Sequence, residues 1–217
     1  MSQHDLGVMG KFYGKIGVIV GFTWKGLQVA RAYISRVANP KTNAQELVRT
    51  RFAAAGHLAS MFLPAITVGL KNLASGRKST DVGEFVRLNW AKIQAATPGE
   101  YTIDYTGLVI AKGGLCGVGF GSPQFDDPLE VAIDITPNLD GYKANANDKV
   151  YILVYCPELE STLLPTPTSR STNSVTIPVP SSWNGQKVYC WGFTLGNATD
   201  NKGLCSNSTY IGSGNIS

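Results

Sequence analysis

Apolar and polar residues alternate with a period of two in two stretches near the N-terminus, residues 14–23 and 27–34. The apolar members of this alternation are Val18, Val20, Phe22, Leu27, Val29 and Tyr33. A short Trp24-Lys25-Gly26 turn separates the two stretches, so the pattern predicts a β-hairpin. Gly14, Gly17 and Gly21 interrupt the first strand and predict bulges or the close approach of another backbone.

A helical period replaces the alternation after Asn39-Pro40, which ends the strand. Asn43 followed by Glu46 three residues later resembles a capping box and predicts the start of a helix. Pro64 is expected to kink this helix or to begin a new one. The stripe of the predicted helix that faces the core contains Leu47, Thr50, Ala54, Leu58 and Met61.

A further helix is predicted after Ser79-Thr80-Asp81. Apolar residues recur there at steps of three and four, the pattern of a buried helical face, and Thr97-Pro98-Gly99 is expected to end the helix. The residues on this face are Val82, Phe85, Val86, Trp90 and Ile93.

Short extended runs dominate the chain from Glu100 onward. Residues 101–114 are predicted to form one or two strands, and a glycine-rich connection follows. Six further strands are predicted at Leu129–Thr136, Lys149–Tyr155, Glu160–Leu164, Ser174–Val179, Gln186–Leu195 and Gly203–Ile211. Short strands at close, regular spacing favour a β-sandwich. No Trp stands at the spacing of true immunoglobulin domains between Cys156 and Cys190, since Trp183 lies too near the second cysteine, so "Ig-like" describes the architecture alone.

The sequence therefore predicts an α+β protein, with an N-terminal β-hairpin and helices followed by a C-terminal Ig-like antiparallel β-sandwich. The expected domains are a basic hairpin-plus-helices module over residues 1–112 and a sandwich over 129–217. The glycine-rich residues 113–128 are expected to connect them.

Charge is unevenly divided between the two halves of this 217-residue chain. Residues 1–99 contain thirteen Lys and Arg against four Asp and Glu, whereas residues 100–217 contain six against eleven. The net charges of +9 and −5 indicate that the two halves face different partners. The basic half either meets nucleic acid, or meets the acidic half of a neighbouring copy, or forms a solvated face.

Targeting and membrane signals are not evident in the sequence. No run of about 18 apolar residues predicts a transmembrane helix, and the N-terminus does not resemble a signal peptide. We therefore expect a location in a cytoplasm or inside a particle, with no membrane partner. Cys116, Cys156, Cys190 and Cys205 form no C-x-x-C pair, so free thiols are expected and a zinc site is not.

Glycine spacing near the N-terminus is the first candidate for chemistry, because phosphate-binding loops are rich in glycine. The interval from Gly10 to Gly14-Lys15 is wrong for a Walker A loop, and Ile16 stands where Ser or Thr is needed. No G-x-G-x-x-G links a strand to a helix, in this stretch or at Gly117–Gly121. Nucleotide binding is not expected at either place.

Catalytic groups are also sparse. The two histidines are His4, near the N-terminus, and His57, which reads as a helix-surface or inter-helix residue. No G-x-S-x-G elbow and no D-x-D-x-D calcium loop are present. The paired carboxylates at Asp126-Asp127 and at Glu158 and Glu160 read as a turn and a strand surface. The sequence therefore predicts a non-enzymatic protein without a cofactor or a metal.

Basic and aromatic residues together are the strongest candidate for a binding surface. Such a mixture binds phosphates and stacks on bases, and a channel for DNA needs only a diffuse positive lining. The residues predicted to make assembly or DNA-channel contacts are Lys15, Trp24, Lys25, Arg31, Arg36, Lys41, Arg49 and Arg51.

The N-terminal motifs resemble those of a domain-of-unknown-function family common in Bacteroidota and their phages, including crAss-like phages. The matching residues are Gly14-Lys15-Ile16-Gly17-Val18-Ile19-Val20-Gly21, Trp24-Lys25-Gly26, Arg31, Asn39-Pro40-Lys41-Thr42, Ala44-Gln45, Arg49, Arg51 and Phe52. A mid-chain pattern from Tyr105 to Leu115 also matches, and the β-rich C-terminal part is looser.

This resemblance implies a structural virion component of a tailed phage, located in the virion and in the host cytoplasm during assembly. A homo-oligomeric ring or collar at the head–tail connection of the neck or tail is expected. Its partners would be other copies, the portal or adjacent ring proteins, and non-specifically bound DNA. The alternative is a β-sandwich binding module for a host glycan or protein, with Tyr189, Trp191 and Tyr210 as an exposed aromatic platform.

Overall fold

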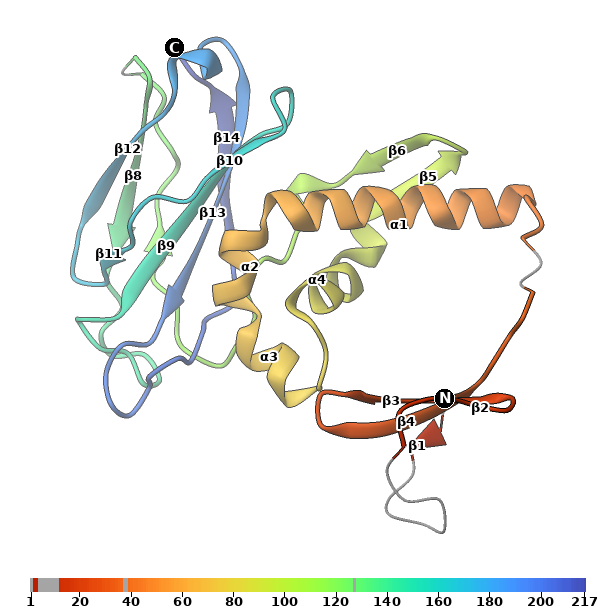
Figure 1. Cartoon of the computed structure of the whole chain (residues 1–217). Helices are drawn as coiled ribbons and strands as arrows, with labels where there is room; N and C mark the ends of the chain where they lie inside the picture. Colours follow the sequence, from red (N-terminus) through yellow and green to blue (C-terminus); the bar gives the residue numbers. More distant parts are fainter. Residues whose placement is uncertain (1, 4–11, 37–38, 127) are drawn as a thin grey trace. The chain divides into compact units, whose positions relative to one another are not determined.

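The chain is organised into two compact units, residues 1–42 and residues 43–217. A computed structural model describes residues 2–3, 12–36, 39–126 and 128–217 (Figure 1). These units differ from the domains expected from the sequence, because the helices belong with the sandwich and not with the N-terminal hairpin. Each unit is described by itself.

The N-terminal unit is an antiparallel four-stranded sheet of order β1-β4-β3-β2. Its strands are β1 (Ser2–Gln3), β2 (Gly14–Ile16), β3 (Ile19–Trp24) and β4 (Leu27–Ala32). The predicted hairpin is confirmed as β3 and β4, which pair from Ile19 with Ala32 to Trp24 with Leu27. The stretch expected as one strand from residue 14 is split into β2 and β3 by a turn at Gly17 and Val18.

Glycine is required at the turns and at one crowded position of this sheet. Lys25 and Gly26 both have positive φ, +46° and +79°, as the type I′ turns that match the twist of a hairpin require. Gly17 has φ +58°, so it forms a turn instead of the bulge that was expected. A Cβ at Gly21 would lie 2.5 Å from the Phe12 ring, which confirms the expected close approach.

Four helices begin the second unit: α1 (Asn43–Met61), α2 (Leu63–Gly69), α3 (Lys71–Gly76) and α4 (Asp81–Asn89). Pro64 lies in the first turn of α2, where its missing N–H costs nothing, and the axes of α1 and α2 differ by 83°. The Thr80 hydroxyl caps α4 by accepting a hydrogen bond from the Gly83 N–H. No single helix among the described residues has the length and hydropathy to cross a membrane; α1 and α2 reach both only when taken together as a bent pair.

The end of α4 differs from the sequence prediction. The helix ends at Asn89, and after a 3-10 turn (η1, Trp90–Lys92) the chain forms an antiparallel pair, β5 (Ile93–Thr97) and β6 (Glu100–Ile103). Pro98 and Gly99, expected to end a helix, instead form the turn between these strands, where Gly99 has φ +89°. A second 3-10 turn (η2, Tyr105–Gly107) follows β6.

Two antiparallel sheets form the predicted sandwich, which confirms the fold class. One sheet has the order β10-β9-β13-β14 with β11 added beside β9, and the other has the order β12-β8-β7. The strands are β7 (Gly119–Phe120), β8 (Glu130–Thr136), β9 (Lys149–Cys156), β10 (Ser161–Leu163), β11 (Thr168–Ser169), β12 (Ser174–Pro178), β13 (Lys187–Leu195) and β14 (Thr209–Asn215). A 3-10 turn (η3, Ser181–Trp183) precedes β13. The sequence missed β7 and β11, and of the run predicted from Gly203 only the last three residues belong to β14.

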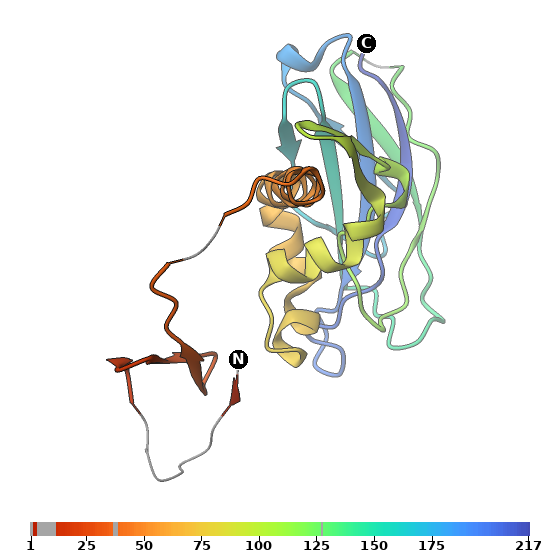
Figure 2. The same ribbon diagram turned by 90° about the vertical axis from the view of Figure 1, so that its right-hand side faces the viewer.

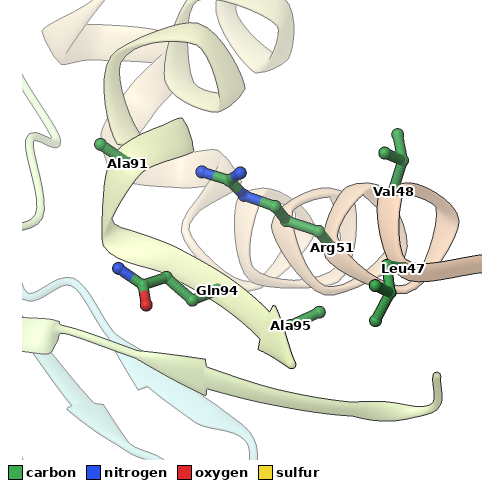
Figure 3. A pocket seen from close by; sticks show the side chains of 6 residues that line it. All are labelled: Leu47, Val48, Arg51, Ala91, Gln94 and Ala95. Atoms are coloured by element: carbon green, nitrogen blue, oxygen red, sulfur yellow. The ribbon is translucent and has the colours of Figure 1, made fainter. Parts of the chain in front are cut away.

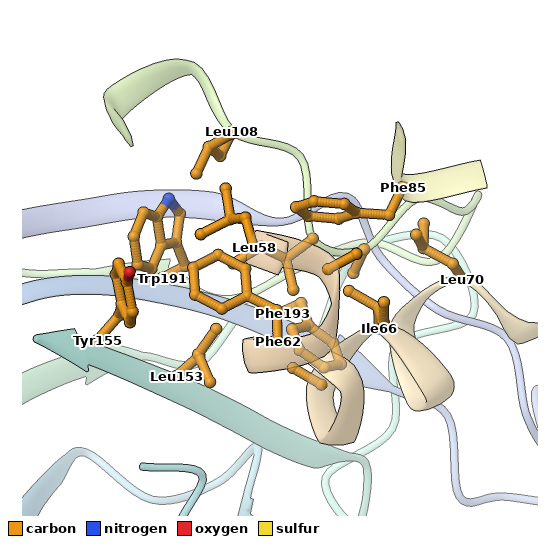
Figure 4. Close-up of a cluster of buried hydrophobic side chains, with 14 of the residues drawn as sticks. Leu58, Phe62, Ile66, Leu70, Phe85, Leu108, Leu153, Tyr155, Trp191 and Phe193 are labelled. Atoms are coloured by element: carbon orange, nitrogen blue, oxygen red, sulfur yellow. The ribbon is translucent and has the colours of Figure 1, made fainter. Parts of the chain in front are cut away.

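The five-stranded sheet lies between the helices on one side and the three-stranded sheet on the other (Figure 2), and a hydrophobic core fills the space on each side of it. One core fills the space between the two sheets and includes Ile133 and Val154. The other joins the helices to the opposite face of β9 and β13, where Phe62 meets Tyr155 and Trp191 (Figure 4). The helices and the sandwich therefore share one core. Part of the expected connection belongs to the sandwich itself, since Val118 is buried in the core between the two sheets and β7 pairs with β8.

A buried ion pair fastens the loops around the Lys149 end of β9. Arg170 Nε lies 3.1 Å from Asp148 Oδ2, and both side chains are fully buried. The Arg170 guanidinium also donates to the carbonyls of Cys116 and Asn138, at 2.6 and 2.9 Å. The other carboxylate oxygen of Asp148 accepts hydrogen bonds from the Asn201 amide and the Asn197 N–H. Four separate loop segments are thereby linked through one pair of charges.

Candidate functional surface

The register of the N-terminal sheet places aromatic, aliphatic and basic side chains on one face. Residues directly opposite each other in antiparallel strands lie on the same face, so Val20 with Arg31, Phe22 with Val29 and Trp24 with Leu27 project together. Lys15 of β2 lies opposite Val20 and joins them. We call this the aromatic–basic face; its members are Lys15, Val18, Val20, Phe22, Trp24, Leu27, Val29, Arg31 and Tyr33.

Three cations lie over aromatic rings in this sheet. Lys15 Nζ is 3.6 Å from the centroid of the Tyr33 ring, and Lys25 Nζ is 5.8 Å from that of Trp24. The Arg31 guanidinium carbon is 5.9 Å from the centroid of the Phe22 ring. The sequence from Phe12 to Thr42 contains no Asp or Glu, so nothing in this stretch offsets the positive charge. These contacts hold the basic groups along the sheet, next to its apolar residues.

Burial in the N-terminal unit is slight. Val18, Tyr33 and Trp24 are 74%, 46% and 44% exposed. Among residues 12–36 and 39–42, only Gly21 and Val29 are buried. A folded unit of this length usually needs a metal, disulfides or a partner, because so few residues cannot build a sufficient core. The aromatic–basic face is thus a surface with the composition of an interface and no core of its own among these residues.

The structure brings together four of the eight predicted contact residues. Lys15, Trp24, Lys25 and Arg31 share the N-terminal sheet. The exposed residues Arg36 and Lys41 lie beyond β4 and before α1, and Arg49 is an exposed residue of α1.

Arg51 has a role in packing that the sequence did not reveal. Its guanidinium lies 4.0 Å from the centroid of the Trp90 ring and donates a hydrogen bond to the Trp90 carbonyl. The side chain therefore ties α1 to the turn that follows α4. The helical periodicity of the sequence could not predict this contact, because Trp90 is 39 residues away in the chain.

Two open hollows flank α1. The first, of about 490 Å³, is lined by Leu47, Val48, Arg51, Ala91, Gln94 and Ala95, with Arg51 turned toward Ala91 (Figure 3). The second, of about 390 Å³, contains His57, whose Nε2 lies 3.2 Å from Glu160 Oε1 in an exposed pair. Neither hollow combines a nucleophile with an oriented base. Within the described residues, no cluster of three or more His, Cys, Asp or Glu is arranged to hold a metal ion.

The four cysteines are free thiols, and three of them are buried. Burial raises the pKa of the Cys190 thiol to about 12 and that of the Cys205 thiol to about 12. Burial also raises the pKa of Tyr105 and Tyr151. The Cys190 and Cys205 thiols are therefore protonated core residues near neutral pH.

We expect the stability of the protein to fall at alkaline pH. Above pH 9 the unfolded chain loses thiol protons that the native state retains, so unfolding becomes more favourable as pH rises toward 12. The slope should approach about 1.4 kcal/mol per pH unit for each of the two thiols. Urea unfolding between pH 7 and 11 measures it, and the C190A/C205A variant should show a shallower slope. A free energy of unfolding that stays constant to pH 11 would contradict the expectation.

The aromatic platform expected on the sandwich is not present. Trp191 is completely buried and packs against Phe62 in the core shared with the helices. Tyr189 and Tyr210 are partly buried against the same core. The sequence did not reveal that these side chains are covered, because the helices that pack on β13 could not be placed from the sequence. The binding-module alternative thereby loses the residues on which it depended.

The fold defines a β-sandwich protein with a helical layer on one sheet and a separate N-terminal sheet. The chain belongs to a family of unknown function, DUF6266, whose model matches residues 11–212. This confirms the expected membership in a family of unknown function. No curated protein matches the chain.

Among solved structures, the chain is similar to the fn3 domain of the human collagen alpha-1(XX) chain. The identity is 11% and the TM-score is 0.33, over 49% of this chain and 86% of that one.

Proposed function

We propose that the protein is a non-enzymatic structural subunit that assembles through its aromatic–basic face. The observation that carries this proposal is that Val18, Trp24 and Tyr33 are exposed, and that few of residues 12–36 and 39–42 are buried. Apolar and aromatic side chains mixed with Arg are typical of protein interfaces. Covering this face would remove apolar surface from water and supply the core that the unit needs.

The setting we propose is a tailed-phage virion, in which copies of the chain form a ring or collar of the neck or tail. The resemblance of the Gly14–Gly21 and Trp24–Gly26 motifs supports this setting. Other copies, the portal or adjacent ring proteins would be the partners, with non-specific DNA contact along the basic residues. The protein would be found in the host cytoplasm during assembly and then in the virion.

Sedimentation of the purified full-length chain tests the assembly. We expect an oligomer that dissociates at least tenfold more readily in the V18S/W24S variant, because both side chains lie on the aromatic–basic face. The matched control is V48S/F52S, which removes two equally exposed apolar residues from α1 and should leave the oligomer intact. A wild-type chain that stays monomeric at all concentrations would contradict a homo-oligomeric ring.

Mass spectrometry and electron microscopy of purified phage particles test the virion setting separately. We expect the chain to be present in mature particles, at a copy number that matches a closed ring. Its absence from the particles would contradict the virion role even if the purified chain assembles.

A further inference from the structure

The outer face of the three-stranded sheet is acidic. In β8 the side chains of Glu130, Ala132, Asp134 and Thr136 point away from the sandwich core, while Val131, Ile133 and Ile135 point into it. The register extends this outer face to neighbouring strands, because Ser174 lies opposite Asp134 and Gly119 lies opposite Thr136. We call it the acidic sheet face; its members are Gly119, Glu130, Ala132, Asp134, Thr136, Ser174 and Thr176.

Negative charge on this face is not offset by nearby basic residues in the sequence. Residues 113–136 contain four acidic residues and no Lys or Arg, and residues 171–186 contain no charged residue. Asp134 is exposed and Glu130 is half-buried. The acidic sheet face is therefore opposite in charge to the aromatic–basic face, because all charged residues in the strands of the latter are basic.

The two faces also differ in side-chain size in a complementary way. Three small residues, Gly119, Gly121 and Ala132, lie near Asp134 on this sheet, and the exposed Gln124 lies opposite Ala132. A Cβ at Gly121 would lie 3.1 Å from the Asp134 Cβ, so a larger side chain would crowd the carboxylate. The aromatic–basic face instead presents large rings and long basic side chains. The glycines and Ala132 leave room beside Asp134 for such side chains.

We propose that the aromatic–basic face of one copy packs on the acidic sheet face of a second copy. This interface rests on the homo-oligomer proposed above and names the partner surface within it. Lys15 and Arg31 would approach Asp134 and Glu130, while Phe22 and Trp24 would cover the small residues. Sheets pack face to face about 10 Å apart, which such side chains span. Because the two surfaces differ, the contact is heterologous and closes into a ring when the rotation between copies permits it.

Nucleic acid is the competing occupant of the aromatic–basic face. Phosphates and bases would use Lys15, Arg31 and the rings, but not the aliphatic residues Val18 and Leu27 of the same face. An acidic protein surface with apolar and small residues would contact both the basic and aromatic side chains and the aliphatic ones. This favours a second copy of the chain.

Charge exchange between full-length variants tests the interface. K15E/R31E makes the first face acidic and E130K/D134K makes the second face basic, so each variant alone brings like charges together. We expect each variant alone to associate at least tenfold more weakly than wild type in sedimentation at low salt. When the two variants are mixed, every contact pairs opposite charges again, and association should return to within about threefold of wild type. E158K/E160K is the matched control and should not restore association with K15E/R31E.

The outcomes of these experiments can contradict the interface without contradicting the proposed assembly role. If V18S/W24S disrupts the oligomer but the mixed charge variants do not recover, the named partner surface is wrong while the assembly role stands. Cross-links between isotope-labelled and unlabelled copies should join β3 or β4 to β8 or β12; cross-links confined to one chain would overturn the interface. The interface would also be overturned by a pair of results. The first is that wild type binds a single-stranded oligonucleotide and K15E/R31E does not, and the second is that E130K/D134K associates as strongly as wild type.

Discussion

Replacing Arg170 by methionine should lower the free energy of unfolding by about 3–5 kcal/mol. The substitution would leave the Asp148 carboxylate fully buried without its charge partner. It would also remove the donors to the carbonyls of Cys116 and Asn138, which lie in two other loops. Urea or thermal unfolding of the full-length chain measures the change.

The matched control for Arg170 is Lys92. Its ammonium lies 3.3 Å from Asp104 Oδ2, but the two side chains are 41% and 46% exposed. Water screens such a pair, so K92M should change stability by about 0.5 kcal/mol or less. The D148L/R170M double variant should cost less than the two single changes together, because it leaves no unpaired buried charge. An R170M variant within 1 kcal/mol of wild type would contradict the role of the pair.

Replacing Phe62 by alanine should cost about 3–5 kcal/mol of stability. The Phe62 ring is completely buried between α1 and α2, and its centroid lies 5.0 Å from that of Tyr155 and 5.5 Å from that of Trp191. It also meets Phe85 of α4, with the centroids 5.9 Å apart. One side chain therefore joins two helical elements to both central strands of the five-stranded sheet, and its loss leaves a cavity there.

F52A is the matched control for F62A, because Phe52 has the same side chain on α1 but is 61% exposed. We expect it to change stability by about 0.5 kcal/mol or less. Residues 43–217 form one unit, so helical circular dichroism and tryptophan fluorescence should give coincident transitions within wild type and, at lower denaturant, within F62A. Two separate transitions, helices before sandwich, would contradict a shared core.

Local signals in the sequence account for most of the elements. The Lys25-Gly26 turn, the alternation of β3 and β4, and the Thr80 cap of α4 depend on residues that are neighbours in the chain. The predicted strands in the sandwich are found at similar bounds from β8 to β13 for the same reason. Short elements such as β7 and β11 were missed, since two residues carry no periodicity.

Strands β9 and β13 are apolar on both sides, a pattern that is visible in the sequence. Val150, Leu153 and Val154 are buried on both sides of β9, and Cys190 to Phe193 are all buried in β13. A strand without a polar side is typical of a sheet covered on both faces. This pattern would have predicted that a helical layer lies on the sandwich, and that Trp191 is a core residue.

The candidate surface was only partly predictable. Lys15, Trp24, Lys25 and Arg31 were identified because charge and aromatic content are visible in the sequence. The position of Lys15, Trp24 and Arg31 on one face follows from the register, which turn geometry fixes at Gly17 and Gly26. The role of Arg51 depends on Trp90, which the fold and not the chain brings near.

The sequence by itself determined the elements whose causes are local: turns, caps, strand alternation and the division of charge between the two halves. Only the tertiary structure decided which faces are covered. Packing of Phe62 on Trp191 joined the helices to the sandwich, and the burial of Asp148 with Arg170 fastened loops far apart in the chain. Such contacts depend on residues distant in sequence, whose pairing minimises exposed apolar surface and unpaired charge over the whole fold. Within the N-terminal sheet, the same balance leaves Val18, Trp24 and Tyr33 exposed.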